Sequence, residues 1–396
     1  MNKRVWLRAE TKPFERRTPL TPDQARNLIT MGHTVTVERS EDRIFPNNKY
    51  EDVGCVMVAA RSWETTAPVD AIILGLKELP DTTTPIKGIH IYFAHCFKGQ
   101  DDSKAVLGQF AKGGGTLYDL EFLKDDHGKR VAAFGYWAGY AGAAVNLLIW
   151  LEKQKGNLPP FTIRTKFDNQ KELVDYIRKG LQKHSKDDRP DATVFGARGR
   201  CGCGVTDLFK KLELETFPFN REETKGKGWF TDILKCTMMF NCVYLDPKTK
   251  IMPFLTLLML RYNQKLSVVG DISCDPNNPD NPIRVYDQCS TFEDPSCRVE
   301  CEGSIPVDVQ AIDHLPALLP RESSEEFSGL LFKHLVEFLA NPKAPIWEQA
   351  RRKFTYMRDR YYPPPVSSTL KRGLFGAAPA AAISGEVALS TPPFLG

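Results

Sequence analysis

Short apolar runs alternate with amphipathic stretches over roughly the first third of the chain. The apolar runs predict buried strands, and the stretches between them predict helices. Thr21 suits the N-cap of one such helix, and Pro22 takes its favoured first position. The predicted strands are Val5–Arg8, His33–Glu38, Ala71–Leu74, Ile89–Ala94 and Thr116–Asp119, and the predicted helices run from Thr21 to about Met31, around Asn48–Asp52 and near Ser103–Phe110. This βαβ rhythm is typical of a doubly wound sheet.

A second α/β unit follows a change in composition. Residues 134–150 are rich in glycine and alanine, which predicts a tightly packed connecting helix. The stretch 152–191 is polar, and the strand Ala192–Phe195 then opens a unit that continues to about Ile312. Residues 315–360 predict a helical segment that places several apolar side chains on one face, namely Leu330, Leu331, Leu335, Phe338 and Leu339.

The length of 396 residues exceeds what one ordinary hydrophobic core supports, so two domains are expected. We predict an α/β fold with two Rossmann-like, doubly wound domains. Residues 1–134 plus 316–362 are expected to form a substrate-side domain, and residues 135–315 a dinucleotide-binding domain. Proline, serine and alanine dominate the end of the chain, so residues 363–396 are expected to form a disordered tail.

Composition narrows the classes of function. The net charge is only +4 and no long basic run occurs, which argues against a nucleic-acid partner. No apolar stretch is long enough to span a bilayer, and the N-terminus lacks a signal-like segment, so we expect a cytoplasmic protein without a membrane partner. The ten cysteines form no CxxC pair and no histidines cluster near them, so we expect no metal site and mostly reduced thiols.

Two titratable side chains follow predicted strands. Lys77 comes after Ala71–Leu74, and His95 comes after Ile89–Tyr92. Ligands of open α/β sheets bind at the C-terminal edge of the strands, so the two residues are a candidate acid/base pair. The alternative is that both are ordinary solvated loop residues.

A glycine-rich segment follows the strand Ala192–Phe195 and precedes an apparent helix over Thr206–Lys211. Ala197, Gly199 and Gly202 have the spacing of G-x-G-x-x-G with alanine first. Such a turn presents backbone N–H groups and a helix N-terminus to a pyrophosphate, which favours dinucleotide binding over a tight turn alone.

The second strand of a dinucleotide site usually ends in an acidic residue that binds the adenosine ribose. Here the expected position is Asn220, followed by Arg221. Asparagine cannot supply the carboxylate, and an adjacent arginine can neutralise a 2′-phosphate, so NADP is possible beside NAD. Alternatively, Arg221 is merely exposed and Asn220 still bonds the ribose.

Longer blocks of sequence extend these motifs in both halves of the chain. They are 9–17, 75–78, 93–98, 115–123, 130–135, 199–202, 241–245 and 312–322. In content and order they resemble fungal saccharopine dehydrogenase of the NAD-dependent, lysine-forming type, and the resemblance extends from Val5 to about Tyr361. That family is itself similar in fold to alanine dehydrogenase.

The resemblance implies two Rossmann-like domains with a cleft between them, and a monomer. It implies oxidation of the secondary amine of saccharopine to an imine by hydride transfer to NAD, followed by hydrolysis to L-lysine and 2-oxoglutarate, in lysine biosynthesis. By motif, Lys77 matches the general base, His95 the general acid and Glu15 a carboxylate that interacts with the lysine. The matched substrate positions are Arg17, Lys98, Gln100, Glu121, Arg130 and Phe134, and the matched cofactor positions are Gly199, Arg200, Thr224, Tyr244, Asp313, His314 and Leu315. We expect the cofactor site to include also Gly202, Asn220 and Ile312.

The chemistry of these residue types agrees with the implied reaction. The substrate amine must be neutral before hydride leaves, and a lysine can accept its proton near neutral pH only if burial or nearby cations lower its pKa. Saccharopine has three carboxylates, for which Arg17, Arg130 and Lys98 are suitable partners. Without the resemblance, we would expect each of the two arginines to form only an ordinary surface ion pair.

Departures from the family pattern are concentrated in the dinucleotide half, where Asn220 replaces an aspartate. Cys201 and Cys242 fall at family cysteine positions, and a disulfide between them is a hypothesis. Two alternatives to the leading function stay open: a diverged, NADP-using relative that couples another amino acid and oxo acid, and a binding protein that keeps the fold without turnover.

Overall fold

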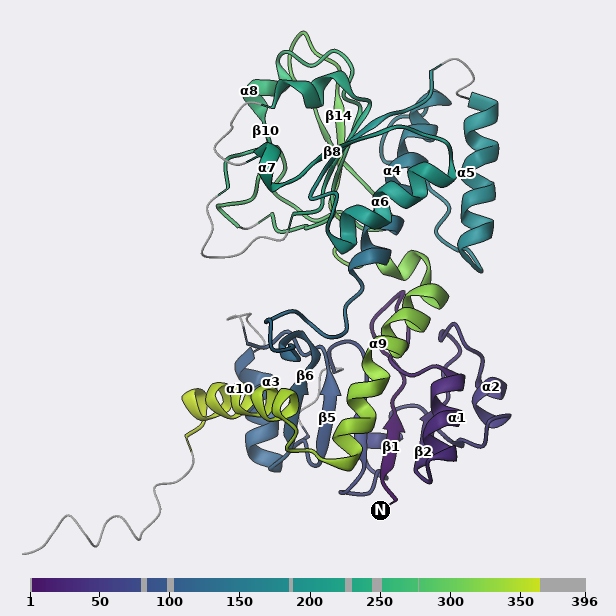
Figure 1. Cartoon of the computed structure of the whole chain (residues 1–396), viewed down its shortest axis with the longest axis vertical. Coiled ribbons are helices and arrows are strands. Elements are labelled where there is room, and N and C mark those ends of the chain that lie inside the picture. Colours follow the sequence, from purple (N-terminus) through teal and green to yellow (C-terminus); the bar gives the residue numbers. More distant parts are fainter. Residues whose placement is uncertain are drawn as a thin grey trace, which may run out of the picture.

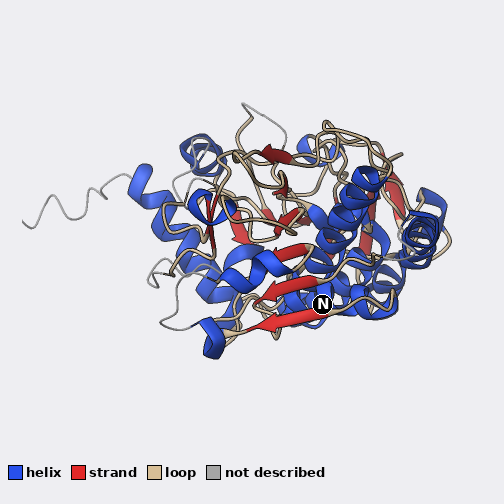
Figure 2. Ribbon diagram, turned by 90° about the horizontal axis from the view of Figure 1, so that it is seen from above, coloured by secondary structure: helices blue, strands red, loops and turns tan. Residues whose placement is uncertain are grey.

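The computed structural model describes residues 2–79, 84–97, 103–184, 188–224, 230–243, 251–276 and 278–363. Two sheets of mainly parallel strands divide these residues into two lobes (Figure 1). The first lobe contains the N-terminal sheet, and the C-terminal helices return to it. In the view from above, helices lie on the outside of the strands (Figure 2). The predicted α/β class with two doubly wound sheets is confirmed.

The first sheet has six parallel strands in the order β3-β2-β1-β4-β5-β6. Its central strands are buried runs of apolar residues, as expected for a sheet covered on both faces. The strands are β1 Arg4–Leu7, β2 Thr34–Glu38, β3 Val56–Val58, β4 Ile72–Leu74, β5 Ile89–Tyr92 and β6 Thr116–Asp119.

Five helices pack around this sheet, three from the start of the chain and two from its end. Thr21 caps the first helix as predicted, because its hydroxyl accepts from the backbone N–H of Gln24 at 3.3 Å. The helices are α1 Pro22–Thr30, α2 Asn47–Glu51, α3 Ser103–Gly113, α9 Pro320–Ala340 and α10 Pro345–Tyr361, with short 3-10 helices at Ser62–Glu64 and Leu120–Phe122. A third 3-10 helix, Leu315–Leu318, packs in the core of the second lobe.

The segment predicted to be helical over 315–360 is helical over most of its length, and two α-helices make up most of it. The first ends at Ala340, and Pro345 takes the first position of the second. Leu331, Leu335 and Phe338 are buried against the first sheet, so the predicted apolar face is confirmed.

The second sheet has the order β13-β14-β11-β9-β7-β8, in which only β13 is antiparallel among the described strands. Its strands are β7 Ala192–Phe195, β8 Thr216–Phe219, β9 Met238–Asn241, β11 Val268–Asp271, β13 Cys297–Val299 and β14 Val307–Gln310, with a separate pair β10 Leu255–Thr256 and β12 Ile283–Arg284. The helices of this lobe are α4 Gly135–Gln154, α5 Gln170–His184, α6 Arg200–Lys211, α7 Arg221–Thr224 and α8 Leu257–Leu260, with a 3-10 helix at Thr231–Lys235.

Glycines bring α4 and α6 into backbone contact. A Cβ atom added at Gly139 would meet the backbone of Cys201, and one added at Gly204 would meet Tyr136 and Tyr140 of α4. The predicted small-residue helix is therefore confirmed as a closely packed element, buried over most of its length.

The predicted domain boundaries at 134/135, 315/316 and 362/363 stay predictions, and residues 364–396 of the predicted tail lie outside the described residues. None of the helices in the described ranges is both long and apolar enough to cross a membrane.

Candidate active site

The C-terminal edge of the first sheet brings together two loops that are far apart in the sequence. The strand order reverses between β1 and β4, and open α/β sheets bind ligands at such a point. Residues 8–17 follow β1 and residues 75–78 follow β4, so the two loops meet there. His95 follows the next strand, β5.

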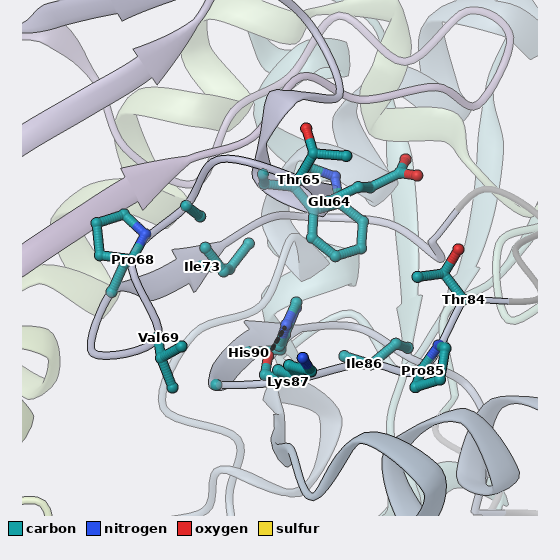
Figure 3. Close-up of a pocket in the computed structure, with 14 residues that line it drawn as sticks. Glu64, Thr65, Pro68, Val69, Ile73, Thr84, Pro85, Ile86, Lys87 and His90 are labelled. Atoms are coloured by element: carbon teal, nitrogen blue, oxygen red, sulfur yellow. Dashed lines mark hydrogen bonds between the residues drawn. The ribbon is translucent and has the colours of Figure 1, made fainter.

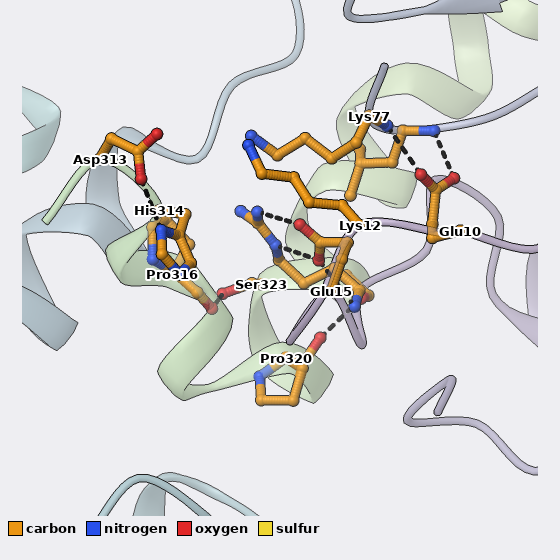
Figure 4. Close-up of polar contacts among 12 residues, drawn as sticks. Glu10, Lys12, Glu15, Lys77, Asp313, His314, Pro316, Pro320 and Ser323 are labelled. Atoms are coloured by element: carbon orange, nitrogen blue, oxygen red, sulfur yellow. Dashed lines mark hydrogen bonds and ion pairs between the residues drawn. The ribbon is translucent and has the colours of Figure 1, made fainter. Parts of the chain in front are cut away.

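Lys77 is partly buried in the loop after β4. Burial lowers the pKa of its amine, and the cations Arg17 and Lys12 lower that pKa further, while Glu15 and Glu78 act in the opposite direction. A lowered pKa favours the neutral amine, which is the form that accepts a proton. The Lys77 and Lys12 side chains extend toward Asp313 of the second lobe (Figure 4).

Glu15 and Arg17 form a buried ion pair beside Lys77. The Nε and Nη2 atoms of Arg17 donate to the two Glu15 oxygens at 2.7 and 2.5 Å. Although burial acts to raise the pKa of Glu15, the charge and hydrogen bonds of Arg17 and the charge of Lys77 lower it overall, so the carboxylate is ionised. The Arg17 guanidinium lies over the ring of Phe134 at 4.5 Å, and that ring stacks on Phe327 of α9.

His95 adopts a left-handed backbone conformation with φ of +50°. Non-glycine residues rarely adopt it, and it often marks functional loops. The ring lies between two carboxylates, with Nε2 3.6 Å from Glu78 and Nδ1 3.8 Å from Glu121. Burial and the Lys77 charge lower the pKa of His95, whereas these carboxylates raise it; the lowering prevails.

Three predicted substrate residues remain, Arg130, Lys98 and Gln100, and among the described residues the structure shows no contact between Arg130 and Lys77 or His95. Arg130 is partly exposed on a turn where its backbone pairs with Lys124. Lys98 and Gln100 lie outside the described residues. The structure thus brings six of the nine predicted catalytic and substrate residues to one sheet edge: Lys77, His95, Glu15, Arg17, Glu121 and Phe134.

The glycine turn after β7 is shorter than predicted, because α6 begins at Arg200 rather than at Thr206. Gly196 has φ of +75°, and Gly199 is the N-cap residue. A Cβ atom added at Gly202 would meet the backbone of Gly196 and Ala197. The first helical turn therefore packs directly on the strand end, which leaves a backbone cradle of the kind that accepts a pyrophosphate.

Asn220 follows β8 beside this cradle. Its side-chain oxygen accepts from the backbone N–H of Arg198 at 3.1 Å, so it fixes the conformation of the glycine turn. Thr224 bonds back to the Asn220 carbonyl at 3.0 Å. Arg221 begins α7 and is exposed, and Tyr244 lies outside the described residues.

The segment after β14 faces the first lobe. Ile312 pairs with Ser290 and is buried, and Leu315 packs near Gly142 of α4. The Asp313 carboxylate bonds the His314 ring at 2.5 Å. This bond, followed by the charges of His314, Lys12 and Lys77, lowers the pKa of Asp313 to about 2 against the opposing effect of burial. Asp313 is therefore an ionised group near the Lys77 amine (Figure 4).

Cys201 and Cys242 are free thiols, so the hypothesised disulfide is not formed. They are nevertheless adjacent, because Cys201 forms a side-chain hydrogen bond that contributes, after burial, to the raised pKa of Cys242.

A cavity of about 340 Å³ lies at the opposite edge of the first sheet (Figure 3). Its lining includes residues that precede β4 and β5, such as Val69 and Gly88, whereas Lys77 and His95 follow those strands. His90 lies at its base, bonds the Lys87 carbonyl at 2.9 Å and is almost fully buried. This cavity is therefore separate from the candidate active site.

Four residues near the site were not predicted from the sequence: Arg8, Glu10, Lys12 and Glu78. Lys12 and Glu78 act on the pKa values of Lys77 and His95, and Arg8 and Glu10 contact the Lys77 backbone. The available signal was their position directly after β1 and β4, the two strands at which the sheet order reverses.

Comparisons with known proteins agree with this arrangement. Residues 6–141 match the family model of the N-terminal domain of alanine dehydrogenase and PNT. The solved structure of an L-alanine dehydrogenase superposes with a TM-score of 0.64 at 14% identity, covering 91% of this chain and 99% of that one, which shows the fold alone.

Two fungal relatives match over most of the chain. The NAD(+)-dependent, L-lysine-forming saccharopine dehydrogenase of Schizosaccharomyces pombe is 43% identical, covering 89% of this chain and 98% of its own. That of Yarrowia lipolytica is 44% identical, covering 89% and 96%. With this identity over nearly the full length of both relatives, the chain belongs to the family of fungal, L-lysine-forming saccharopine dehydrogenases.

Proposed function

We propose that this protein is an NAD-dependent oxidoreductase that cleaves saccharopine to L-lysine and 2-oxoglutarate, and that it also catalyses the reverse reaction. The observation that supports this most directly is the position of Lys77. It is a partly buried amine with a lowered pKa at the strand-order reversal, beside the Glu15–Arg17 pair and near Asp313 of the cofactor-side lobe.

The second lobe fits a dinucleotide. Gly199 and Gly202 leave a cradle that added Cβ atoms would fill, at the N-terminus of the twelve-residue helix α6. Backbone groups of residues 199–202 would bind the pyrophosphate, and Asn220 lies where the adenosine ribose is expected. A dinucleotide held there would supply the hydride acceptor for the substrate carbon.

The side chains of the first lobe perform the proton transfers in this proposal. Lys77 accepts a proton from the ammonium form of the secondary amine. The nitrogen is then neutral when the C–N carbon loses hydride. The imine then adds water, and His95, which lies between Glu78 and Glu121, transfers protons during this addition and the following C–N cleavage. Arg17 and Arg130 are suited to bind substrate carboxylates.

A direct assay tests the proposal. The purified protein is mixed with lysine, 2-oxoglutarate and NADH, and the loss of reduced cofactor is followed, with omission of lysine as the control. We expect turnover that needs all three reactants. Turnover with NADPH but not with NADH, or only with an amino acid other than lysine, would favour a diverged relative. Absence of both turnover and cofactor binding in folded protein would favour a non-catalytic protein.

We also propose a cytoplasmic monomer. The ten free thiols support a reducing compartment. Light scattering after size exclusion should give the chain mass of 44.7 kDa, and twice this value would contradict the monomer.

A further inference from the structure

Two charged side chains from the loop after β1 bind the peptide groups around Lys77. One oxygen of the Glu10 carboxylate accepts from the backbone N–H of Leu76 at 2.7 Å, and the other accepts from that of Lys77 at 2.9 Å. The Nη2 atom of Arg8 donates to the Lys77 carbonyl. Both polar backbone groups of Lys77 therefore have a charged partner, as Figure 4 shows for Glu10.

These two side chains are buried and paired. The side chains of Arg8 and Glu10 are 1% and 6% exposed, and Arg8 Nη1 lies 3.4 Å from a Glu10 oxygen. A buried charge is costly unless it is paired and hydrogen-bonded. Here the two charges face each other, and both also bond the backbone of residues 76–77, although burial still raises the pKa of Glu10 against the opposing charge of Arg8.

The path of Arg8 is also restricted by its neighbours. Its guanidinium crosses Gly75, where an added Cβ atom would meet it directly. It also lies over the ring of Tyr92, 5.4 Å from the ring centre. Gly75 is thus small at the one place where the arginine must pass to reach the Lys77 carbonyl.

We propose that Arg8 and Glu10 are positioning residues that fix the backbone of Lys77 and thereby direct its amine into the active site, a role that rests on the proposed function of Lys77 as general base. Lysine has a flexible four-carbon side chain, so the place of its amine depends on where the backbone directs it. A base must lie within hydrogen-bond reach of the proton it accepts, and a misplacement of about 1 Å can cost ~10²-fold in rate.

Two variants test the proposal by different routes. Glu10→Gln replaces one of the two acceptor oxygens with an amide nitrogen, so at least one bond to residues 76–77 is lost. Gly75→Ala keeps every charge and displaces the Arg8 guanidinium from the Lys77 carbonyl. Asp308→Asn is the matched control, because Asp308 is also buried and paired with a cation, Lys153, but it lies in β14 of the second lobe.

The readouts are kcat and KM for saccharopine, and the pH dependence with which Lys77 is acetylated by trace acetic anhydride, measured by peptide mass spectrometry. Both test variants should lower kcat by roughly 10- to 100-fold with little change in KM. Acetylation of Lys77 should require a higher pH, because the amine leaves its buried place beside Arg17 and Lys12. The control should lower thermal stability without changing either readout.

An unchanged kcat together with an unchanged acetylation profile in folded Gly75→Ala protein would overturn the proposal, even if Glu10→Gln fails to fold. The same holds if Asp308→Asn alters the acetylation profile of Lys77 equally, since the effect would then be general destabilisation. If the wild-type protein does not act on saccharopine, the proposed function fails, whereas the acetylation profile still reports whether the two residues position Lys77.

Discussion

One Glu15 oxygen accepts from both the Nε atom and the backbone N–H of Arg17, at 2.7 and 3.0 Å. The turn that allows this places Phe14 at φ of +64°. It also places two opposite charges beside Lys77, with opposite effects on the pKa of its amine. The Glu15–Arg17 pair therefore influences the pKa of Lys77 through two opposing charges.

Substitutions in this pair should move the pH profile of saccharopine oxidation in opposite directions. Activity requires the neutral Lys77 amine, so it is lost as pH falls through the pKa of Lys77. Arg17→Met removes a cation that lowers this pKa, so the acidic limb of kcat should move to higher pH. Glu15→Gln removes an anion that raises it, so the limb should move to lower pH.

Both variants break a buried pair and should lose stability by about 3–5 kcal/mol, to be measured by urea unfolding. If the acidic limbs of the two variants move in the same direction, the pair acts on Lys77 only by fixing the position of the Lys77 side chain.

Replacement of Lys77 should nearly abolish turnover. Lys77→Met should lower kcat by ~10²–10⁴-fold, the usual contribution of a general acid or base, and a small added primary amine should restore part of the rate. Lys87→Met is the control, since Lys87 is exposed at the opposite edge of the sheet. A rate for Lys77→Met within twofold of wild type would exclude the assignment.

His90 should make stability depend on pH. Burial lowers its pKa to about 4 in the folded protein, opposed by its bond to the Lys87 carbonyl. The unfolded chain titrates near pH 6.5 and binds more protons between the two values, so stability falls as pH falls through this window. Lowering the pH from 7 to 5 should cost the folded state about 2 kcal/mol through His90.

Urea unfolding at both pH values measures this loss. The free energy of unfolding of His90→Gln should no longer include it, whereas His127→Gln, which changes a residue on an exposed turn, should still show it. Equal pH dependence in wild type and His90→Gln would mean that the buried ring is not neutral.

Two glycine substitutions should change stability with opposite signs. Gly204→Ala places a methyl group against the backbone of Tyr136 and Tyr140, and should destabilise the protein by about 1–3 kcal/mol. Gly329→Ala lies in open space on α9 and should stabilise it by about 0.5–1 kcal/mol, because alanine favours helix. Thermal unfolding of the two variants checks both signs, and a neutral Gly204→Ala would mean that α4 and α6 separate easily.

Much of the fold could be predicted from local patterns. Thr116–Asp119 and Ala192–Phe195 were predicted with their observed bounds, and each is a short strand that is largely buried in a sheet of parallel strands. The start of α6 was predicted six residues too late, since glycines in Arg200–Val205 suggested a loop. In the structure those glycines are helical and permit close contact with the strand end and with α4.

The positions of Lys77, His95 and Glu15 in one site could be predicted from strand ends and from the family resemblance. The contacts of Arg8 and Glu10 could not, because they depend on which strands are neighbours. β1 and β4 are separated by 64 residues in the sequence, and only their pairing brings Glu10 to Leu76. Long-range pairing of this kind leaves no local signal.

The return of α9 and α10 to the first sheet has a consequence for synthesis on the ribosome. The core around β1 and β4 includes Phe327, Phe338 and Trp347, which emerge long after those strands. The lobe that begins with α4 is contiguous and can fold while the remainder is still being translated. The half of the molecule that is made first, with Lys77 and His95, therefore completes its core only when the last helices have been made, and its apolar strands stay partly uncovered during that interval.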